Sequence, residues 1–455
     1  MTETNIRAHL LELLRGKRFS ELRDMLDEMN PVDIAEQMEE LVSEEEISGD
    51  ELPMLFRILP KNLAADVFAE MDGDMQELLI RSFSDRELKE VIDDMYLDDA
   101  VDLIEEMPAI VVGRILKNVD AETRKSINQL LNYPEDSAGS IMTIEYVSLK
   151  KEMTVQEAFA RIRQTGVDKE TIYTCYVTDG SRRLIGLVSV RDLLLADYEN
   201  TMEEIMETNI ISVNTSDDKE LVAQTLSKYG FFAIPVVDGE MRLVGIVTVD
   251  DAMDVMQEEA TEDIEKMAAI TPSDKPYLKT GVWETWKQRV PWLLLLMVSA
   301  TFTSIIIKSF EEALAAQVVL TAFIPMLMDT GGNCGGQASV TIIRALSTGD
   351  VEFSDLLRVV WKELRVALAC GVTLAAVSFG KLLLLDRVGT VVALVVSLTL
   401  ATTIFFAKII GCTLPMLAKK VGFDPAVMAS PLITTIVDAI SLSVYFRFAT
   451  MILKI

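Results

Sequence analysis

A single carboxylate interrupts the last apolar stretch of the sequence: Asp438, within SPLITTIVDAISLSVYF. A charged side chain near the middle of a bilayer costs several kcal/mol, so it must face a partner or a water-filled path. The only histidine is His9, and the apolar segments offer just Lys381 and Lys408 as counter-ions. Mg²⁺ keeps much of its water and is held by one or two carboxylates. Asp438 therefore predicts a cation ligand, with a hydrogen-bonded contact between helices as the alternative.

A second polar group lies in PMLMDTGGNCGGQAS, residues 325–339. Asp329, Asn333 and Gln337 follow one another at intervals of four residues, which places their oxygen-bearing side chains on one face of a helix. The glycines between them permit close approach of neighbouring backbones. A packing motif of small residues would explain the glycines but not the polar stripe. The segment is therefore predicted to line a pore.

Two further groups of carboxylates lie outside the apolar segments. The first forms a ridge at spacings of three and four residues on a predicted helix, where like charges are mildly destabilising. The alternative is a solvated acidic face, but a second cluster occurs far upstream, and two acidic surfaces come together only if cations neutralise them. The ridge is Asp251, Asp254, Glu258, Glu262 and Glu265, widened by Asp250, Glu259 and Asp263, and the upstream cluster is Asp93, Asp94, Asp98, Asp99 and Asp102.

The charge balance excludes several classes of protein. Residues 1–289 contain 61 acidic and 30 basic residues, whereas residues 290–455 contain 10 and 12. So acidic a segment repels phosphate backbones, which excludes nucleic acid as a partner, and it suits hard divalent cations. The four cysteines form no CxxC pair, and one histidine cannot supply a triad or a zinc site. We therefore expect no enzyme.

The elements that must position these residues change in character along the chain. In residues 1–130, apolar residues recur at three and four spacing, as in Leu55, Ile58, Leu59 and Leu63, and prolines punctuate the pattern. This pattern predicts all-α structure, either a helical superhelix or an ordinary helical domain. Residues 1–40 are polar and amphipathic, so no signal peptide is expected and the N-terminus should remain in the cytosol.

A repeat follows the helical region. YTCYVTDGSRRLIGLVSVRDLLLAD and FFAIPVVDGEMRLVGIVTVDDAMDV align at an offset of 59 residues, which matches Gly186 with Gly245 and Asp192 with Asp251. Each copy reads as strand, turn, strand and helix. This pattern resembles a pair of CBS domains, α/β modules that normally pack as one unit.

The rest of the chain is apolar enough for lipid. Spans of about 20 residues are needed to cross a bilayer, and we predict five: 290–307, 313–328 continuing to Leu346, 366–385, 388–407 and 426–446. Lysines and arginines concentrate in the loops after the second and fourth spans, on the side of the N-terminus. The sequence therefore predicts a multi-pass protein of the cell membrane (inner or plasma membrane) with a cytosolic N-terminus.

With these motifs in place, the whole chain resembles the MgtE family of Mg²⁺ channels. The resemblance rests on the 325–337 signature, the DPA of residues 424–426, SPLITTIVD ending at Asp438, and the order of the domains. It implies an acidic helical domain (1–135), tandem CBS domains (136–258), a linking or plug helix (259–288) and a five-helix membrane domain (289–455). It also implies a homodimer with a pore between subunits, in which Asp438 holds hydrated Mg²⁺ and Asn333 lies nearby.

The resemblance further implies regulation by cytosolic Mg²⁺. Bound ions would hold the helical and CBS domains together, the linking helix would close the pore, and loss of Mg²⁺ would open it. The implied regulatory residues are Asp98, Asp102, Asp250, Asp254, Glu258, Glu259, Glu262, Asp263 and Asp424.

CBS pairs often bind adenosine nucleotides, which adds ATP as an expected modulator. By motif, Ser189 and Asp192 in the first copy, and Thr248 and Asp251 in the second, would contact it. No Walker A motif occurs, so ATP hydrolysis is not expected. The competing functions are a carrier that couples divalent metal to another cation, a CBS-containing anion channel, which Asp438 disfavours, and a non-conducting membrane Mg²⁺ sensor.

Overall fold

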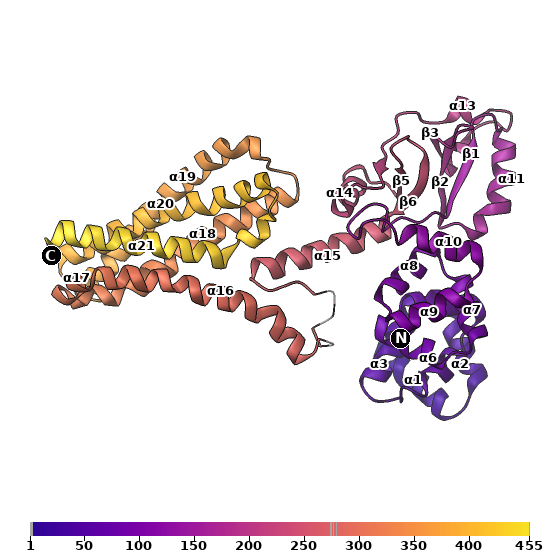
Figure 1. Ribbon diagram of the computed structural model, residues 1–455, viewed down its shortest axis with the longest axis horizontal. Helices are drawn as coiled ribbons and strands as arrows, with labels where there is room; N and C mark the ends of the chain where they lie inside the picture. Colours follow the sequence, from indigo (N-terminus) through magenta and orange to yellow (C-terminus); the bar gives the residue numbers. More distant parts are fainter. Residues whose placement is uncertain (1–2, 274, 276, 279, 455) are drawn as a thin grey trace. The chain divides into compact units, whose positions relative to one another are not determined.

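The computed structural model describes residues 3–273, 275, 277–278 and 280–454. The chain divides into two compact units, Met1–Val255 and Met256–Ile455, each with its own fold (Figure 1).

The first unit begins with a run of helices, which confirms the all-α prediction. Three phenylalanines, Phe56, Phe68 and Phe83, form the aromatic centre of its core, with ring centroids 5.3–6.2 Å apart. The helices are α1 (Glu3–Arg15), α2 (Phe19–Asp27), α3 (Pro31–Ser43), α4 (Leu52–Phe56), α5 (Lys61–Ala69), α6 (Gly73–Ser82), α7 (Asp85–Asp94), α8 (Leu97–Glu106), α9 (Ala109–Asn118) and α10 (Ala121–Leu130).

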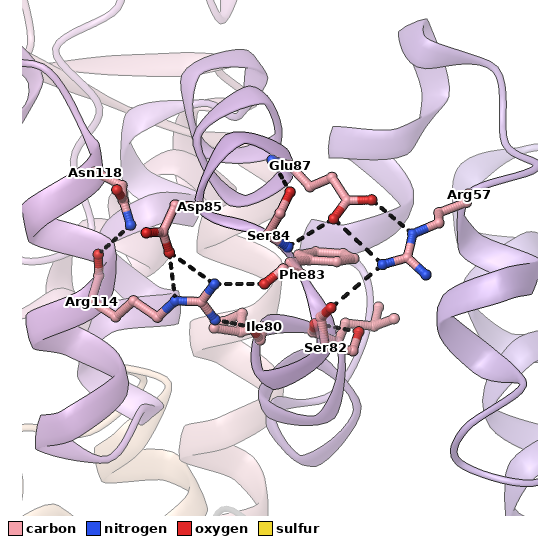
Figure 2. Close-up of polar contacts among 10 residues, drawn as sticks. Arg57, Ile80, Ser82, Phe83, Ser84, Asp85, Glu87, Arg114 and Asn118 are labelled. Atoms are coloured by element: carbon pink, nitrogen blue, oxygen red, sulfur yellow. Dashed lines mark hydrogen bonds and ion pairs between the residues drawn. The ribbon is translucent and has the colours of Figure 1, made fainter.

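Two arginines tie neighbouring helices of this run together (Figure 2). Arg57, at the end of α4, donates through Nε to Glu87 Oε1 at 2.7 Å. The same glutamate completes a capping box with Ser84 at the start of α7. Arg114 of α9 donates to Asp85 and to the carbonyl oxygens of Ile80 and Phe83. Both arginines therefore satisfy groups at the α6–α7 junction that the helices cannot satisfy internally.

Two α/β repeats complete the first unit. Each sheet has a parallel pair followed by an antiparallel strand, in the orders β1-β2-β3 and β4-β5-β6, which confirms the CBS pair. The first repeat contains β1 (Tyr146–Lys150), α11 (Val155–Thr165), η1 (Gly166–Asp168), β2 (Thr171–Thr178), β3 (Leu184–Ser189) and α12 (Val190–Leu195). The second contains α13 (Met202–Ile205), β4 (Val213–Asn214), α14 (Lys219–Tyr229), β5 (Ala233–Val237), β6 (Leu243–Thr248) and the start of α15 (Val249–Met267), which continues past Val255 into the second unit.

The two repeats pair with each other through a reciprocal exchange of hydrogen bonds. The backbone N–H of Leu184 donates to the carbonyl of Met241, and that of Leu243 donates to the carbonyl of Arg182, both at 3.0 Å. These two hydrogen bonds join the start of β3 to the turn before β6 and the start of β6 to the turn before β3. The two copies therefore form one unit, as the sequence predicts.

The linking helix is shorter than the sequence suggests. Helix α15 ends at Met267, and the next helix begins only at Val282. The helix predicted across 259–288 is therefore wrong for the described residues between these points, while 274, 276 and 279 lie outside the described residues. The physical reason is local: Ala269 has a left-handed backbone (φ 56°), and Pro272 follows, which cannot continue a helix.

The second unit is a bundle of long helices (Figure 1). Its elements are α16 (Val282–Ser309), α17 (Glu311–Ala316), η2 (Val318–Phe323), α18 (Ile324–Ser347), η3 (Phe353–Asp355), α19 (Leu356–Leu384), α20 (Thr390–Val421), η4 (Pro425–Met428) and α21 (Ser430–Leu453). Among the described residues, four segments (α16, η3–α19, α20 and η4–α21) are long and apolar enough to cross a membrane. Helix α18 is long enough, with 24 residues, but its glycines and polar stripe lower its hydropathy. The count of five spans stays a prediction.

Candidate metal sites

One acidic group forms where α8 meets the two parallel strands of the first CBS repeat. Asp98 lies in the first turn of α8. Because β1 and β2 are parallel and paired from their first residues, the residues that precede them, Glu145 and Glu170, are neighbours, and Glu170 N–H donates to the Glu145 carbonyl at 2.9 Å. Glu145 Oε2 in turn accepts the N–H of Leu97 at 3.1 Å, which holds the start of α8 at the same point.

The resulting trio has the ligand chemistry of a hard divalent cation. One carboxylate oxygen each from Asp98, Glu145 and Glu170 lies within 4.8 Å of the others. Glu170 Oε2 is buried and has no hydrogen-bond partner among the described residues. A buried carboxylate oxygen without a donor is costly unless a cation satisfies it, so the residues fit Mg²⁺. Neither Glu145 nor Glu170 is among the residues predicted from the sequence, although each directly precedes a β-rich run.

Further carboxylates surround this trio and repel it. Burial, followed by the charge of Asp251, raises the pKa of Asp98 well above its usual range and that of Asp99 to about 6. Burial, followed by Asp250 and Asp251, raises the pKa of Glu170 to about 7. Asp251 accepts a 2.6 Å hydrogen bond from Thr248, which fixes its carboxylate in the group.

The other predicted regulatory residues of the first unit lie around the same group. Asp102 is exposed one turn after Asp98 on α8. Asp250 and Asp254, at the start of α15, act on Glu70, which directly follows α5 and whose pKa is raised by burial and then by Asp254. Glu70 is a further member of this group that the sequence did not predict. Carboxylates of the helical domain and of the start of the ridge therefore lie close together within this unit, and their regulatory role stays a prediction.

These shifts predict a pH-dependent stability in the absence of Mg²⁺. Carboxyls whose folded pKa is raised bind more protons in the folded state, so the stability that they contribute is fully present below their unfolded pKa of about 4 and is lost as the pH rises through their folded pKa values of about 6 and about 7. We expect the melting temperature of the full chain in detergent, with chelator, to fall by on the order of 5 °C between pH 5.5 and pH 8. Mg²⁺ should stabilise more at pH 8, because its ligands must be deprotonated. A melting temperature that rises over this interval would contradict the assignment.

A second charged group lies in the second unit at the end of α15. Lys266 Nζ is 2.5 Å from Glu262 and 2.7 Å from Asp424. Asp424 also caps η4, accepting the N–H of Ala426 at 2.7 Å, and Asp263 is half-buried nearby, its pKa raised by burial and then by Asp424. Three predicted regulatory residues thus gather here, with the ammonium of Lys266 between two of them. Glu258 and Glu259 lie on α15 between the two groups.

The polar stripe on α18 occupies its own face of the helix. Asp329, Asn333 and Gln337 are exposed, whereas the glycines between them are buried. A Cβ on Gly332 would lie 2.7 Å from Thr434 of α21, so only glycine permits this approach. Packing and polarity therefore belong to different faces of α18: the glycines pack against α20 and α21, and the polar side chains remain open in a single chain.

Asp438 lies beside this stripe. It is half-buried on α21, and the charge of Asp329 acts on its carboxylate. The two lysines considered as counter-ions are engaged elsewhere: Lys381 pairs with Asp386 at 3.3 Å, and Lys408 with Glu363 at 3.8 Å. Among the described residues, no lysine or arginine forms an ion pair with Asp438, which leaves its charge for a cation.

The two predicted nucleotide half-sites differ in accessibility. Ser189 and Asp192 form an exposed capping box at the start of α12, whereas Thr248 is buried and Asp251 belongs to the acidic group. Two exposed aromatic side chains, Tyr173 and Phe232, lie with ring centroids 6.1 Å apart. This pair is not predicted from the sequence, because the two residues come from different repeats.

Comparison with known proteins identifies the domains of the chain. The chain matches the MgtE intracellular N domain over residues 29–136, CBS domains over 138–199 and 202–258, and the MgtE divalent cation transporter domain over 324–448. It is 37% identical to the magnesium transporter MgtE of Thermus thermophilus, covering 99% of both chains. It is 32% identical to the magnesium transporter MgtE of Bacillus subtilis, covering 99% of this chain and 98% of that one.

Solved structures agree with the fold of the first unit. A crystal structure of the cytosolic domain of the Mg²⁺ channel MgtE in complex with ATP has a TM-score of 0.51 and 36% identity, covering 55% of this chain and 99% of that one. The soluble part of a magnesium transporter has a TM-score of 0.52 and 31% identity, covering 57% of this chain and 99% of that one. From the helical N domain to the membrane helices, the chain belongs to the MgtE family of magnesium transporters.

Proposed function

We propose that the chain is an Mg²⁺-selective channel that imports Mg²⁺ into the cytosol and is closed by cytosolic Mg²⁺. The observation that carries this proposal is the exposed stripe of Asp329, Asn333 and Gln337 beside Asp438, a carboxylate without a basic partner among the described residues. Oxygen-bearing side chains on one side of a path suit a cation that retains its water.

The same stripe supports a homodimer. Polar side chains on the open face of a membrane helix are costly against lipid, so they must line water or another protein surface. A second copy of the chain facing this stripe would enclose the path and place two copies of Asp438 around it. The positive loops next to Arg344 and Lys419 favour an N-terminus in the cytosol and insertion in the cell membrane.

The acidic group of the first unit supports the closing mechanism. Without cations, Asp98, Glu145, Glu170 and Asp251 repel one another across the contact between the helical and CBS domains. Mg²⁺ bound there would favour the compact arrangement, and α15 would transmit it to the membrane domain. A ligand shifts such an equilibrium only by its preference for one state, which several coupled sites supply steeply.

Lys266 gives the end of α15 a contact that needs no metal. Its ammonium joins Glu262 of α15 to Asp424 before η4. We expect Lys266→Met to leave two carboxylates facing each other and to shift channel closure to Mg²⁺ concentrations higher by about tenfold. Flux measured against cytosolic Mg²⁺ checks this. The matched control is Lys275→Met, which removes an exposed ion pair with Glu284. Equal midpoints for the two variants would contradict a role for this contact in closure.

ATP is the proposed modulator, because the related cytosolic domain was solved with ATP. Tyr173 and Phe232 supply aromatic surface for a base, and Asp192 is exposed for ribose hydroxyls. We expect Tyr173→Ala to weaken ATP binding to the full chain by about tenfold, the usual value of a base stacked on an aromatic ring. Calorimetry would measure it, with Tyr198→Ala, an exposed tyrosine beside Phe159, as the control. Equal affinities would remove these rings from the site.

The function itself is tested by Mg²⁺ flux into proteoliposomes with Mg²⁺ as the only gradient. Flux at low Mg²⁺ on the cytosolic face that stops at high Mg²⁺ there supports a gated channel. Flux that requires a proton or Na⁺ gradient would favour the coupled carrier, and no flux at any Mg²⁺ concentration would favour the sensor.

A further inference from the structure

Two oppositely charged side chains are buried against each other inside the membrane unit. Lys408 of α20 and Glu363 of α19 are 8% and 13% exposed, with Nζ 3.8 Å from Oε2. Among the described residues, Glu363 Oε2 has no hydrogen-bond partner. A buried charge is costly without its partner, so the pair needs an explanation beyond packing, and neither residue belongs to the pore stripe or the regulatory groups.

The pair lies directly behind the glycine-rich face of α18. Helix α20 crosses α18 at Gly411, where a Cβ would lie 2.3 Å from the carbonyl oxygen of Gly335. Lys408 is one turn before this crossing, and its charge acts on Cys334 of α18. Cys334 adjoins Asn333, so the ammonium lies one helix away from the polar stripe.

We propose that Lys408 and Glu363 form a charge-balancing pair that sets the affinity of the path for divalent cations. The proposal rests on the proposed function, because it takes the stripe of α18 as the path. A fixed ammonium behind the path repels Mg²⁺ with twice the force that it exerts on a monovalent cation, and in a low dielectric this repulsion extends across one helix. Glu363 cancels it, and the negative charge of Asp438 and Asp329 then dominates.

The test compares the half-saturating Mg²⁺ concentration of flux for full-length variants in proteoliposomes. We expect Glu363→Gln, which leaves the ammonium uncompensated, to raise this concentration by about tenfold, and Lys408→Met to lower it. The double variant E363Q/K408M should return to within about twofold of the unsubstituted chain. Lys381→Met, which breaks the more exposed pair with Asp386, is the control and should leave the value unchanged.

A charge-swapped variant, E363K/K408E, keeps the pair and therefore the fold while placing the carboxylate next to α18. It should lower the half-saturating concentration even if the single variants do not fold. The melting temperature could fall in both single variants while the half-saturating Mg²⁺ concentration stays constant in every folded variant. That result would show that the pair is structural and would overturn the proposal. If Mg²⁺ flux depends on a pH gradient and Glu363→Gln removes this dependence, the proposal is overturned in favour of proton exchange. Asp438→Asn tests the path separately, because it does not alter this pair.

Discussion

Asp438→Asn is expected to reduce Mg²⁺ flux by about 100-fold while leaving the melting temperature of the protein unchanged. The substitution keeps the size and one oxygen of the side chain but removes its charge. Attraction between one carboxylate and a divalent cation across a water layer is worth about 3 kcal/mol at intermediate dielectric. Among the described residues, no lysine or arginine pairs with Asp438, so the loss falls on the cation and not on an ion pair.

The matched control is Asp386→Asn, the same substitution at the end of α19, where the carboxylate pairs with Lys381. It should leave flux nearly unchanged. Asp329→Asn is expected to have an intermediate effect, because Asp329 is more exposed but acts on Asp438. Wild-type flux in Asp438→Asn would place the cation path elsewhere and would leave the hydrogen-bonded helix contact as the role of Asp438.

The features predicted correctly from the sequence are those set by local spacing. Asp329, Asn333 and Gln337 share a face because a helix returns to the same side every four residues, and the structure leaves that face exposed. The CBS repeat followed from the matched positions of Gly186 and Gly245. The sequence shows that glycines and polar residues alternate in this segment, but not which neighbours each kind faces. The structure places the glycines and the polar stripe on different faces of α18.

The features that the sequence did not reveal depend on pairing between distant segments. Glu145 and Glu170 meet Asp98 because two parallel strands begin side by side and one glutamate accepts the N–H of Leu97. No spacing rule contains that register. Tyr173 and Phe232 likewise come from different repeats. The end of α15 is different, because Pro272 is a visible stop signal in the sequence, and the helix predicted across 259–288 followed the family resemblance past it.

The contact of Lys266 also changes how the ridge is understood. Sequence spacing placed all its carboxylates on one strip that cations would neutralise together. The structure instead divides the ridge into two groups, one in each unit, and among the described residues an ammonium lies between the carboxylates of the second group alone. We therefore expect the stability of the group around Glu170 to depend more strongly on bound cations than that of the group around Glu262.

For that reason, Glu170→Gln should separate the two effects of Mg²⁺ on the first unit. Without Mg²⁺ at pH 8, the substitution removes a carboxylate whose pKa is raised to about 7 by burial and by Asp250 and Asp251. We expect a gain of roughly 2 kcal/mol, or about 5 °C in melting temperature. Added Mg²⁺ should raise the melting temperature of this variant by less than it raises that of the unsubstituted chain, because one of three clustered ligands is lost.

A higher melting temperature without Mg²⁺, together with a smaller stabilisation by Mg²⁺, is the result expected for a metal ligand held among like charges. Glu152→Gln, an exposed glutamate in the same repeat, is the control and should alter neither value. In flux measurements, the channel that carries Glu170→Gln should close with a shallower dependence on cytosolic Mg²⁺, since one coupled site is weakened. If the variant is destabilised without Mg²⁺ and stabilised by Mg²⁺ as much as the unsubstituted chain, then Glu170 is a structural residue and the sensing site must be built from other carboxylates.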